Sequence, residues 1–188
     1  TIQESGTYLL SGTCADGSIK VKKGTTGVTL VLSGLTLTSK TTAPIICAKS
    51  TEVTIVAAAN TENTLTDTEN NNADAGGEEA ENAVIKCKDG STVTLCGTGT
   101  LNVTANGKNG IKSGASTESE GDASLTIREL TLNITAPVND AVNAEAALNV
   151  ESGTLTIAAG DDALHCDNTL NIGAENTAGP SITITACY

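Results

Sequence analysis

The 188-residue chain has no phenylalanine, tryptophan or methionine, and its only aromatic residues are Tyr8 and Tyr188. A globular core normally takes much of its buried area from large aromatic side chains, so a core of ordinary composition is excluded. Binding of sugars by stacking on aromatic faces is excluded for the same reason. Apolar residues still make up 38% of the chain, which argues against intrinsic disorder.

Positive charge is scarce as well. The chain has 10 basic against 22 acidic side chains and a net charge of −12, so a nucleic-acid partner is not expected. No apolar run approaches the roughly 20 residues of a spanning helix, and we expect no membrane insertion. The six cysteines include no C-x-x-C pair, which favours an oxidising compartment and an extracellular or cell-surface location.

Short β-branched strands recur in a fixed order of three types. The first type reads VTLVL from Val28, VTIVA from Val53 and VTLCG from Val93, and shorter versions follow. The second type reads LTLTS, NTLTD, TLNVTA, LTLNITA, TLTIAA and SITITA. The third type reads APIICA, NAVIKC, NGIKSG, DAVNAE and DALHCD. We interpret TYLLSGTCADGSIKV near the N-terminus as a partial coil of the second and third types.

Three short strands per repeat of roughly 22 residues are typical of a parallel β-helix. We therefore predict an all-β fold: one right-handed parallel β-helix (solenoid) over residues 1–188, with about six to seven coils and open ends. Alternation directs Val28, Leu30 and Leu32 inward in one strand, and Leu130, Leu132 and Ile134 in another. Two polar stretches, 68–81 and 116–122, interrupt the repeats, and we expect them to be flexible loop insertions.

The repeated phrases resemble a known family. SGTYLLSGTCADGSIKV, VTLVLSGLTLTSKTTAPI, ENTLTD, GTLNVTANGKNGIKS and AGDDALHCDNTLNI are similar to the secreted bacterial calcium-associated β-helix carbohydrate-binding domain family. The resemblance spans nearly the whole chain and implies a polysaccharide-lyase-like fold. It also implies binding of acidic plant polysaccharide together with calcium.

Acidic turns stack before the third strand type. Asn139-Asp140 and Asp161-Asp162 occupy the same place in successive coils, so Asp140 and Asp162 should lie about 4.8 Å apart. Carboxylates and amide oxygens at this spacing suit calcium, which takes 6–8 oxygen ligands. The other interpretation is ordinary turn chemistry, because Asp and Asn favour turns without any metal.

Four cysteines and two asparagines are further candidates. Cys47 and Cys87 fall in one inward column of adjacent coils, which permits either a disulfide or two buried thiols. Cys14 and Cys187 follow second-type strands at opposite ends, and an intermolecular disulfide could join them if subunits stack. Asn102 and Asn133 begin N-x-T sequons and are possible glycosylation sites.

Catalysis is not expected. Arg128 is the sole arginine and lies away from the acidic turns, and His165, the sole histidine, points outward without an evident partner. We place no catalytic residue and predict that the chain is not an enzyme.

Two functions remain open. Uncapped β-helix ends expose unpaired backbone, so we expect a structural subunit that associates with itself end to end into an extracellular fibre or cell-surface filament. The alternative is a calcium-dependent module that binds acidic polysaccharide of the pectin or cellulose type, and a polysaccharide lyase is the third choice.

Overall fold

The computed structural model describes residues 1–187 and contains eighteen strands and one short 3-10 helix, with no α-helix among those residues. The strands form a twelve-stranded sheet and a six-stranded sheet, and all pairings between strands are parallel. This all-β arrangement is compatible with a β-helix-like solenoid. In the part of the chain that the structure describes, no helix is long and apolar enough to cross a membrane.

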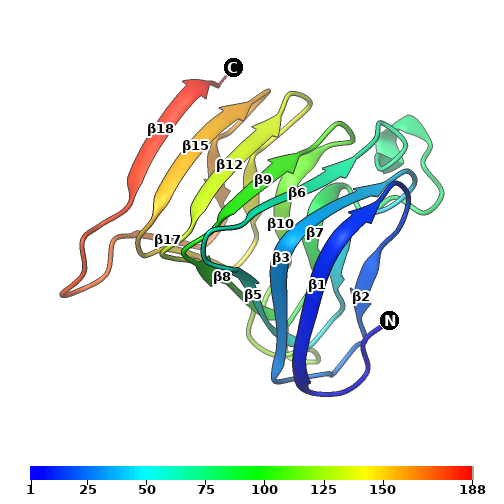
Figure 1. The fold of residues 1–188 in the computed structure, drawn as a ribbon, viewed down its shortest axis with the longest axis horizontal. Coiled ribbons are helices and arrows are strands. Elements are labelled where there is room, and N and C mark those ends of the chain that lie inside the picture. The colour runs from blue at the N-terminus through cyan, green and yellow to red at the C-terminus, as the bar shows by residue number, and fades with distance from the viewer. Residues whose placement is uncertain (188) are drawn as a thin grey trace.

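The large sheet consists of two faces that share its longest strands. β1 (Gly6–Cys14) and β3 (Val28–Ser39) run through both faces. β3 bends at Gly34, whose φ of 72° lies in the region that glycine adopts without steric cost. Figure 1 shows the strands of the second face in a row, with the two chain ends at opposite ends of the row.

Every face is built from strands that recur once per coil. The first face continues through β5 (Glu52–Ala57), β8 (Thr92–Gly97), β11 (Ser124–Ile127), β14 (Ala147–Val150) and β17 (Thr169–Ile172). The second face continues through β6 (Glu62–Asp67), β9 (Thr100–Thr104), β12 (Thr131–Ala136), β15 (Thr154–Ala159) and β18 (Ser181–Ala186). The third face is the small sheet: β2 (Ile19–Val21), β4 (Ile45–Cys47), β7 (Ala83–Cys87), β10 (Asn109–Ser113), β13 (Val142–Ala144) and β16 (Leu164–Cys166).

The core is aliphatic, as the alternation predicts. Val28, Leu30 and Leu32 are each at most 1% exposed, and so are Leu130, Leu132 and Ile134. Parallel strands in register place like residues above one another, so ladders of Leu, Ile and Val fill the interior without aromatic rings. This packing accounts for the unusual composition.

The N-terminal segment differs from the prediction. We expected a partial coil with strands of the second and third types only. β1 instead pairs with β3 along both faces, from Gly6 beside Val28 to Cys14 beside Leu37, with one register shift between Leu10 and Gly12. The register shift lets β1 follow the bend of β3. A search of the sequence for separate short strands does not detect one long strand that bends in this way.

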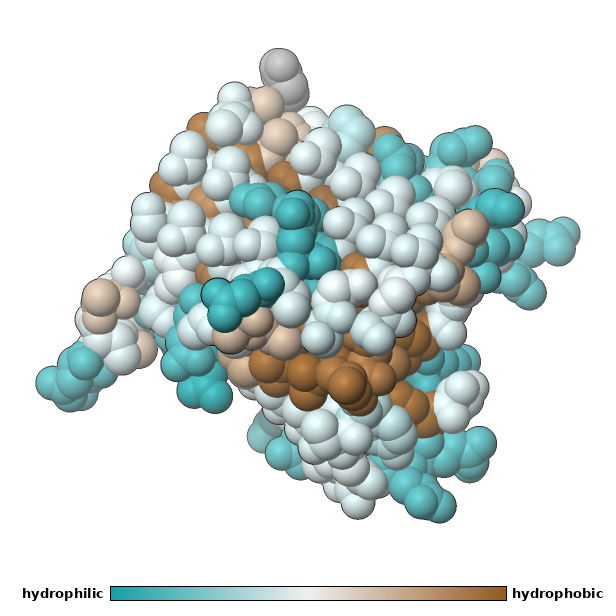
Figure 2. All heavy atoms as spheres, in the orientation of Figure 1, coloured by the Kyte–Doolittle hydropathy of each residue, from teal (hydrophilic) through white to brown (hydrophobic). Residues whose placement is uncertain are grey.

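An apolar column lies on the outside of the first face. Leu9, Val31, Val56 and Cys96 are neighbours in register on β1, β3, β5 and β8, and Leu9 is 70% exposed. Figure 2 shows apolar atoms gathered below the middle of the view, while the second face in front is mostly pale. The pale colour reflects the outward threonines of that face.

The insertion at 68–81 is anchored by a buried amide and is not a free excursion. Asn71 is fully buried, and its Nδ2 donates to Asp67 Oδ2 and to the Ala83 carbonyl at 2.8 and 2.9 Å. Its Oδ1 accepts from the backbone N–H groups of Glu81 and Asn82 at 2.7 and 3.2 Å. Burial raises the pKa of Asp67, although hydrogen bonds from Asn71 and two backbone groups oppose this.

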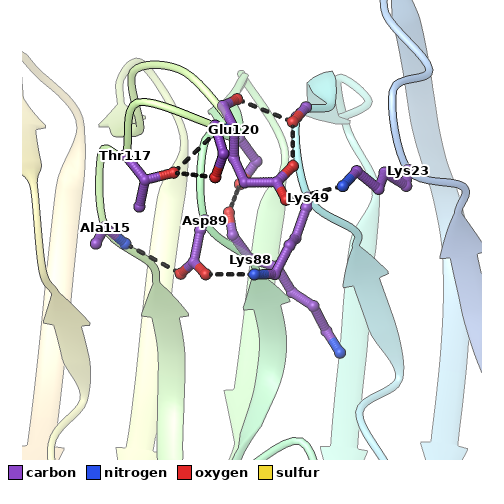
Figure 3. Close-up of polar contacts among 10 residues, drawn as sticks. Lys23, Lys49, Lys88, Asp89, Ala115, Thr117 and Glu120 are labelled. Carbon is purple, nitrogen blue, oxygen red and sulfur yellow. Dashed lines mark hydrogen bonds and ion pairs between the residues drawn. The ribbon is translucent and has the colours of Figure 1, made fainter.

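The insertion at 116–122, which we call the strap, is also held in place, contrary to the expected flexibility. Glu120 forms an ion pair with Lys23 Nζ at 2.8 Å, and this contact is the main cause of its lowered pKa. Ser50 Oγ donates to both the carbonyl oxygen and Oε2 of Glu120, each at 2.8 Å. Figure 3 shows the strap reaching across to the turns that carry these residues.

A second ion pair lies beneath the strap. Asp89 Oδ2 is 2.9 Å from Lys49 Nζ, and its Oδ1 accepts from the Ala115 N–H at 3.3 Å (Figure 3). Four turns of the chain therefore meet at this corner.

Candidate functional site

The third face presents one outward column that changes character along its length. In register from β2 to β16, the column contains Lys20, Ile46, Lys86, Lys112, Asn143 and His165. Three of the first four positions are lysines, whereas the last two are polar and lie beside carboxylates. The face is therefore basic toward the N-terminal coils and acidic toward the C-terminal ones.

Three of the four predicted metal-ligating residues meet at the acidic end. One carboxylate oxygen from each of Asp140, Asp161 and Asp162 lies within 4.8 Å of the others. Asp161 and Asp162 are exposed, whereas Asp140 is only 4% exposed. The predicted stacking of Asp140 and Asp162 is confirmed by the hydrogen bond from the Asp162 N–H to Asp140 Oδ1 at 3.1 Å.

Asn139 stands apart from the three carboxylates in its hydrogen bonding. Its side-chain amide donates to Asn109 Oδ1 at 2.8 Å, and its carbonyl accepts from the N–H groups of Gly160 and Asp161. Its role in the structure is therefore to hold the turn before β16.

The spacing Asp-x-x-polar recurs in two successive coils. Asn143 Nδ2 donates to Asp140 Oδ2 at 2.6 Å, and His165 Nδ1 lies 3.0 Å from Asp162 Oδ2. Asn143 and His165 of the outward column thus each position the carboxylate three residues before them.

His165 has two hydrogen-bond partners that were not expected from the sequence. Its Nε2 lies 2.8 Å from Asp167 Oδ1, so the imidazole sits between two carboxylates. The hydrogen bond with Asp167, followed by the one with Asp162, raises the pKa of His165. The expectation of an unpartnered surface histidine was wrong because both partners lie on the local turns, within three residues.

This acidic cluster has the donor set of a hard cation. Carboxylate oxygens on three residues can ligate one ion, because each oxygen carries two lone pairs and the existing hydrogen bonds occupy only part of them. Asp140 is oriented by Asn143 and by the Asp162 N–H, which reduces the motion that ion binding would have to freeze.

The basic end has a different geometry. Lys86 and Lys112 lie in register on β7 and β10. Lys112 pairs with Glu145 at 3.3 Å, whereas no carboxylate of residues 1–187 lies within ion-pair distance of the Lys86 Nζ. Burial, followed by repulsion from Lys112, lowers the pKa of Lys86.

An open hollow of about 440 Å³ adjoins the basic end. Its lining includes Lys20 and Ile46 from the third face, and Glu79 and Glu81 from the 68–81 insertion. Ile46 is the register neighbour of Lys86, so the hollow lies next to the lysine pair in the outward column.

The predicted disulfide between Cys47 and Cys87 is not formed. The two residues are buried neighbours in register, as expected, but all six cysteines are free. In-register parallel neighbours keep their Cβ atoms near the strand spacing of about 4.8 Å, whereas a disulfide needs about 3.8 Å. The contact with Cys87, together with burial, raises the pKa of the Cys47 thiol.

The register does not align Cys14 with Cys187. Cys14 lies beside Leu37, and the same column continues through Leu65, Val103, Ile134 and Ile157 to Ile184. A register shift places Ala186 beside Ala158, so Cys187 is two register positions beyond that column, or about 7 Å along a strand. A straight stack in register would therefore leave the two thiols too far apart for a disulfide.

The two sequon asparagines belong to a row on the second face. Asn133 Nδ2 donates to Asn102 Oδ1 at 2.8 Å, and Asn102 Nδ2 donates to Glu62 Oε1 at 2.8 Å.

Comparison with known proteins agrees with the fold. A family model described as carbohydrate-binding domain-containing protein matches residues 1–187. No curated protein matches the chain. A solved structure of the polysaccharide lyase-like protein from C. thermocellum, a gadolinium derivative, is 25% identical with a TM-score of 0.61. The match covers 98% of this chain and 86% of that one.

Proposed function

Because the chain belongs to the family of carbohydrate-binding domain-containing proteins, we propose that it is an extracellular, non-catalytic module that binds acidic polysaccharide through calcium. The observation that carries the proposal is the cluster of Asp140, Asp161 and Asp162 on the outward side of the third face. These three residues would hold the ion. When bound, calcium supplies free coordination positions for sugar oxygens and carboxylates.

The net charge supports a bridging cation. A protein of charge −12 and a uronate polymer repel each other, and the three carboxylates make the repulsion strongest at this point. A divalent ion held there cancels most of the local negative charge and can itself coordinate a uronate carboxylate. The similar structure is a gadolinium derivative, and gadolinium, like calcium, is a hard cation that takes oxygen ligands.

A lyase is the weaker interpretation. The similar structure is called polysaccharide lyase-like, but the family description names binding. Arg128, the sole arginine, lies at the end of β11 on the first face, away from the acidic cluster.

The right-handed closed β-helix also remains part of the proposal. It is supported by the pairing of each strand with its counterpart one coil later.

Calcium binding is tested by replacing the two exposed ligands. The combined Asp161→Asn and Asp162→Asn variant should bind calcium at least about tenfold more weakly by titration calorimetry, because it loses two formal charges at the site. Glu118→Gln with Asp122→Asn removes the same charge from the exposed strap and should bind as the wild type does. If all three proteins bound calcium with equal affinity, the three aspartates would be ordinary turn residues and not calcium ligands.

A second candidate function is end-to-end association, and one observation favours it. Apolar side chains of the last coil are exposed: Leu170 by 41%, Ile172 by 56% and Ile184 by 53%. A further coil, from another copy, would cover them and pair the open edges of β17 and β18.

Association is tested by sedimentation velocity and electron microscopy of the 188-residue chain. We expect concentration-dependent assembly that Ile184→Asp abolishes and Thr183→Asp, an outward neighbour, largely retains. A monodisperse monomer at high concentration would exclude this function. Non-reducing gels should show monomer only, since Cys14 and Cys187 are out of register.

A further inference from the structure

The basic half of the third face has no function in the calcium proposal. Lys86 and Lys112 are half-buried neighbours on β7 and β10, about one strand spacing apart. Placing two ammonium groups side by side and partly out of water is unfavourable unless an anion accompanies them. The lowered pKa of Lys86 has burial as its first cause and Lys112 as its second.

Glu81 and Glu145 lie close enough to oppose the lowering of the Lys86 pKa, but among the described residues neither forms an ion pair with its Nζ. Glu81 pairs with Lys88 at 2.6 Å, and Glu145 pairs with Lys112 at 3.3 Å. On a chain with only 10 basic residues, a half-buried lysine without an acidic partner is exceptional. The open hollow lined by Lys20, Ile46, Glu79 and Glu81 lies further along the same column.

We propose that Lys86 and Lys112 form a carboxylate-binding subsite, which engages a uronate unit of the same polysaccharide chain without any calcium. The inference rests on the proposed function and divides the third face into two contacts: lysines at one end and cation-bridged aspartates at the other. The column of the two lysines continues through Asn143 and His165, which contact Asp140 and Asp162, so a linear glycan running along the stacking direction reaches both contacts.

The arrangement also explains a preference for acidic sugars. A neutral sugar could not compensate the unpaired ammonium group of Lys86, and the partial desolvation of that group would oppose binding of the sugar. A carboxylate accepts a charge-assisted hydrogen bond from each lysine and removes that penalty.

The experiment measures binding of polygalacturonate and of its fully methyl-esterified form, with calcium and with a chelator. At low salt and without calcium, wild type should retain weak binding to polygalacturonate and show none to the ester. Lys86→Gln with Lys112→Gln should lower that calcium-free affinity about tenfold. Lys22→Gln with Lys40→Gln removes the same charge from exposed positions and should change it little.

The outcomes separate the two proposals. If wild type binds no polygalacturonate even with calcium, the proposed function fails and the subsite with it. If wild type binds only with calcium, or if both lysine pairs lose affinity equally, the subsite fails and the proposed function stands. Selective loss of the calcium-dependent part in Asp161→Asn with Asp162→Asn, with the calcium-free part retained, supports the division into two contacts.

A measurement on the wild-type protein tests the subsite independently of any folding defect in the variant that lacks both lysines. After reductive methylation with ¹³C-formaldehyde, the dimethylamine signals of Lys86 and Lys112, assigned from the single variants, should shift on adding galacturonate with chelator present. Methyl galacturonate ester should leave them unchanged. Unmoved Lys86 and Lys112 signals with galacturonate would overturn the subsite.

Discussion

Replacing Ile134 by aspartate should lower the free energy of unfolding by about 4 kcal/mol or more. Ile134 is 1% exposed and lies in register between Val103 and Ile157, so a carboxylate there would have no water and no partner. Denaturation followed by circular dichroism measures the change. Thr135→Asp, one residue further along β12 and exposed, is the matched control and should cost within about 0.5 kcal/mol. Equal midpoints for the two variants would contradict the inward assignment of β12.

Replacing Asn71 by alanine should cost about 3 kcal/mol, because it leaves several buried groups without partners. The lost contacts are those to Asp67, the Ala83 carbonyl and the N–H groups of Glu81 and Asn82. The insertion at 68–81 should then exchange its amide hydrogens faster, as mass spectrometry can resolve by segment. Asn70→Ala changes an exposed neighbour and should leave both stability and exchange nearly unchanged. An insertion that exchanges fast already in the wild type would contradict its anchoring.

The ladders of the core could be predicted because strand alternation is a local signal. Inward and outward positions follow from every second residue, and the repeats then place Ile134 or Leu30 in the same interior. The stacking of Asp140 and Asp162 followed from the same repeat. Register along one face is thus readable wherever consecutive coils have similar lengths.

The insertions and the partners of single side chains could not be predicted in this way. Glu120 contacts Lys23 and Ser50, which are far away in sequence, and no periodic pattern links them. Asn71 looks like any polar loop residue until its four hydrogen bonds are known. Strand alternation directs Lys86 and Lys112 outward, but the lack of an ion pair at Lys86 depends on Glu81 pairing with Lys88 and Glu145 pairing with Lys112.

The strap changes how the N-terminal coils come apart. In a stack whose layers touch only their neighbours, the end layer can peel away alone, and unravelling proceeds layer by layer. Glu120, which lies between β10 and β11, ties down the turns after β2 and β4, so it reaches past β7 to layers that β10 does not touch. A pulling force on the N-terminus therefore acts on several coils that the strap holds together, and these coils must unfold as one unit.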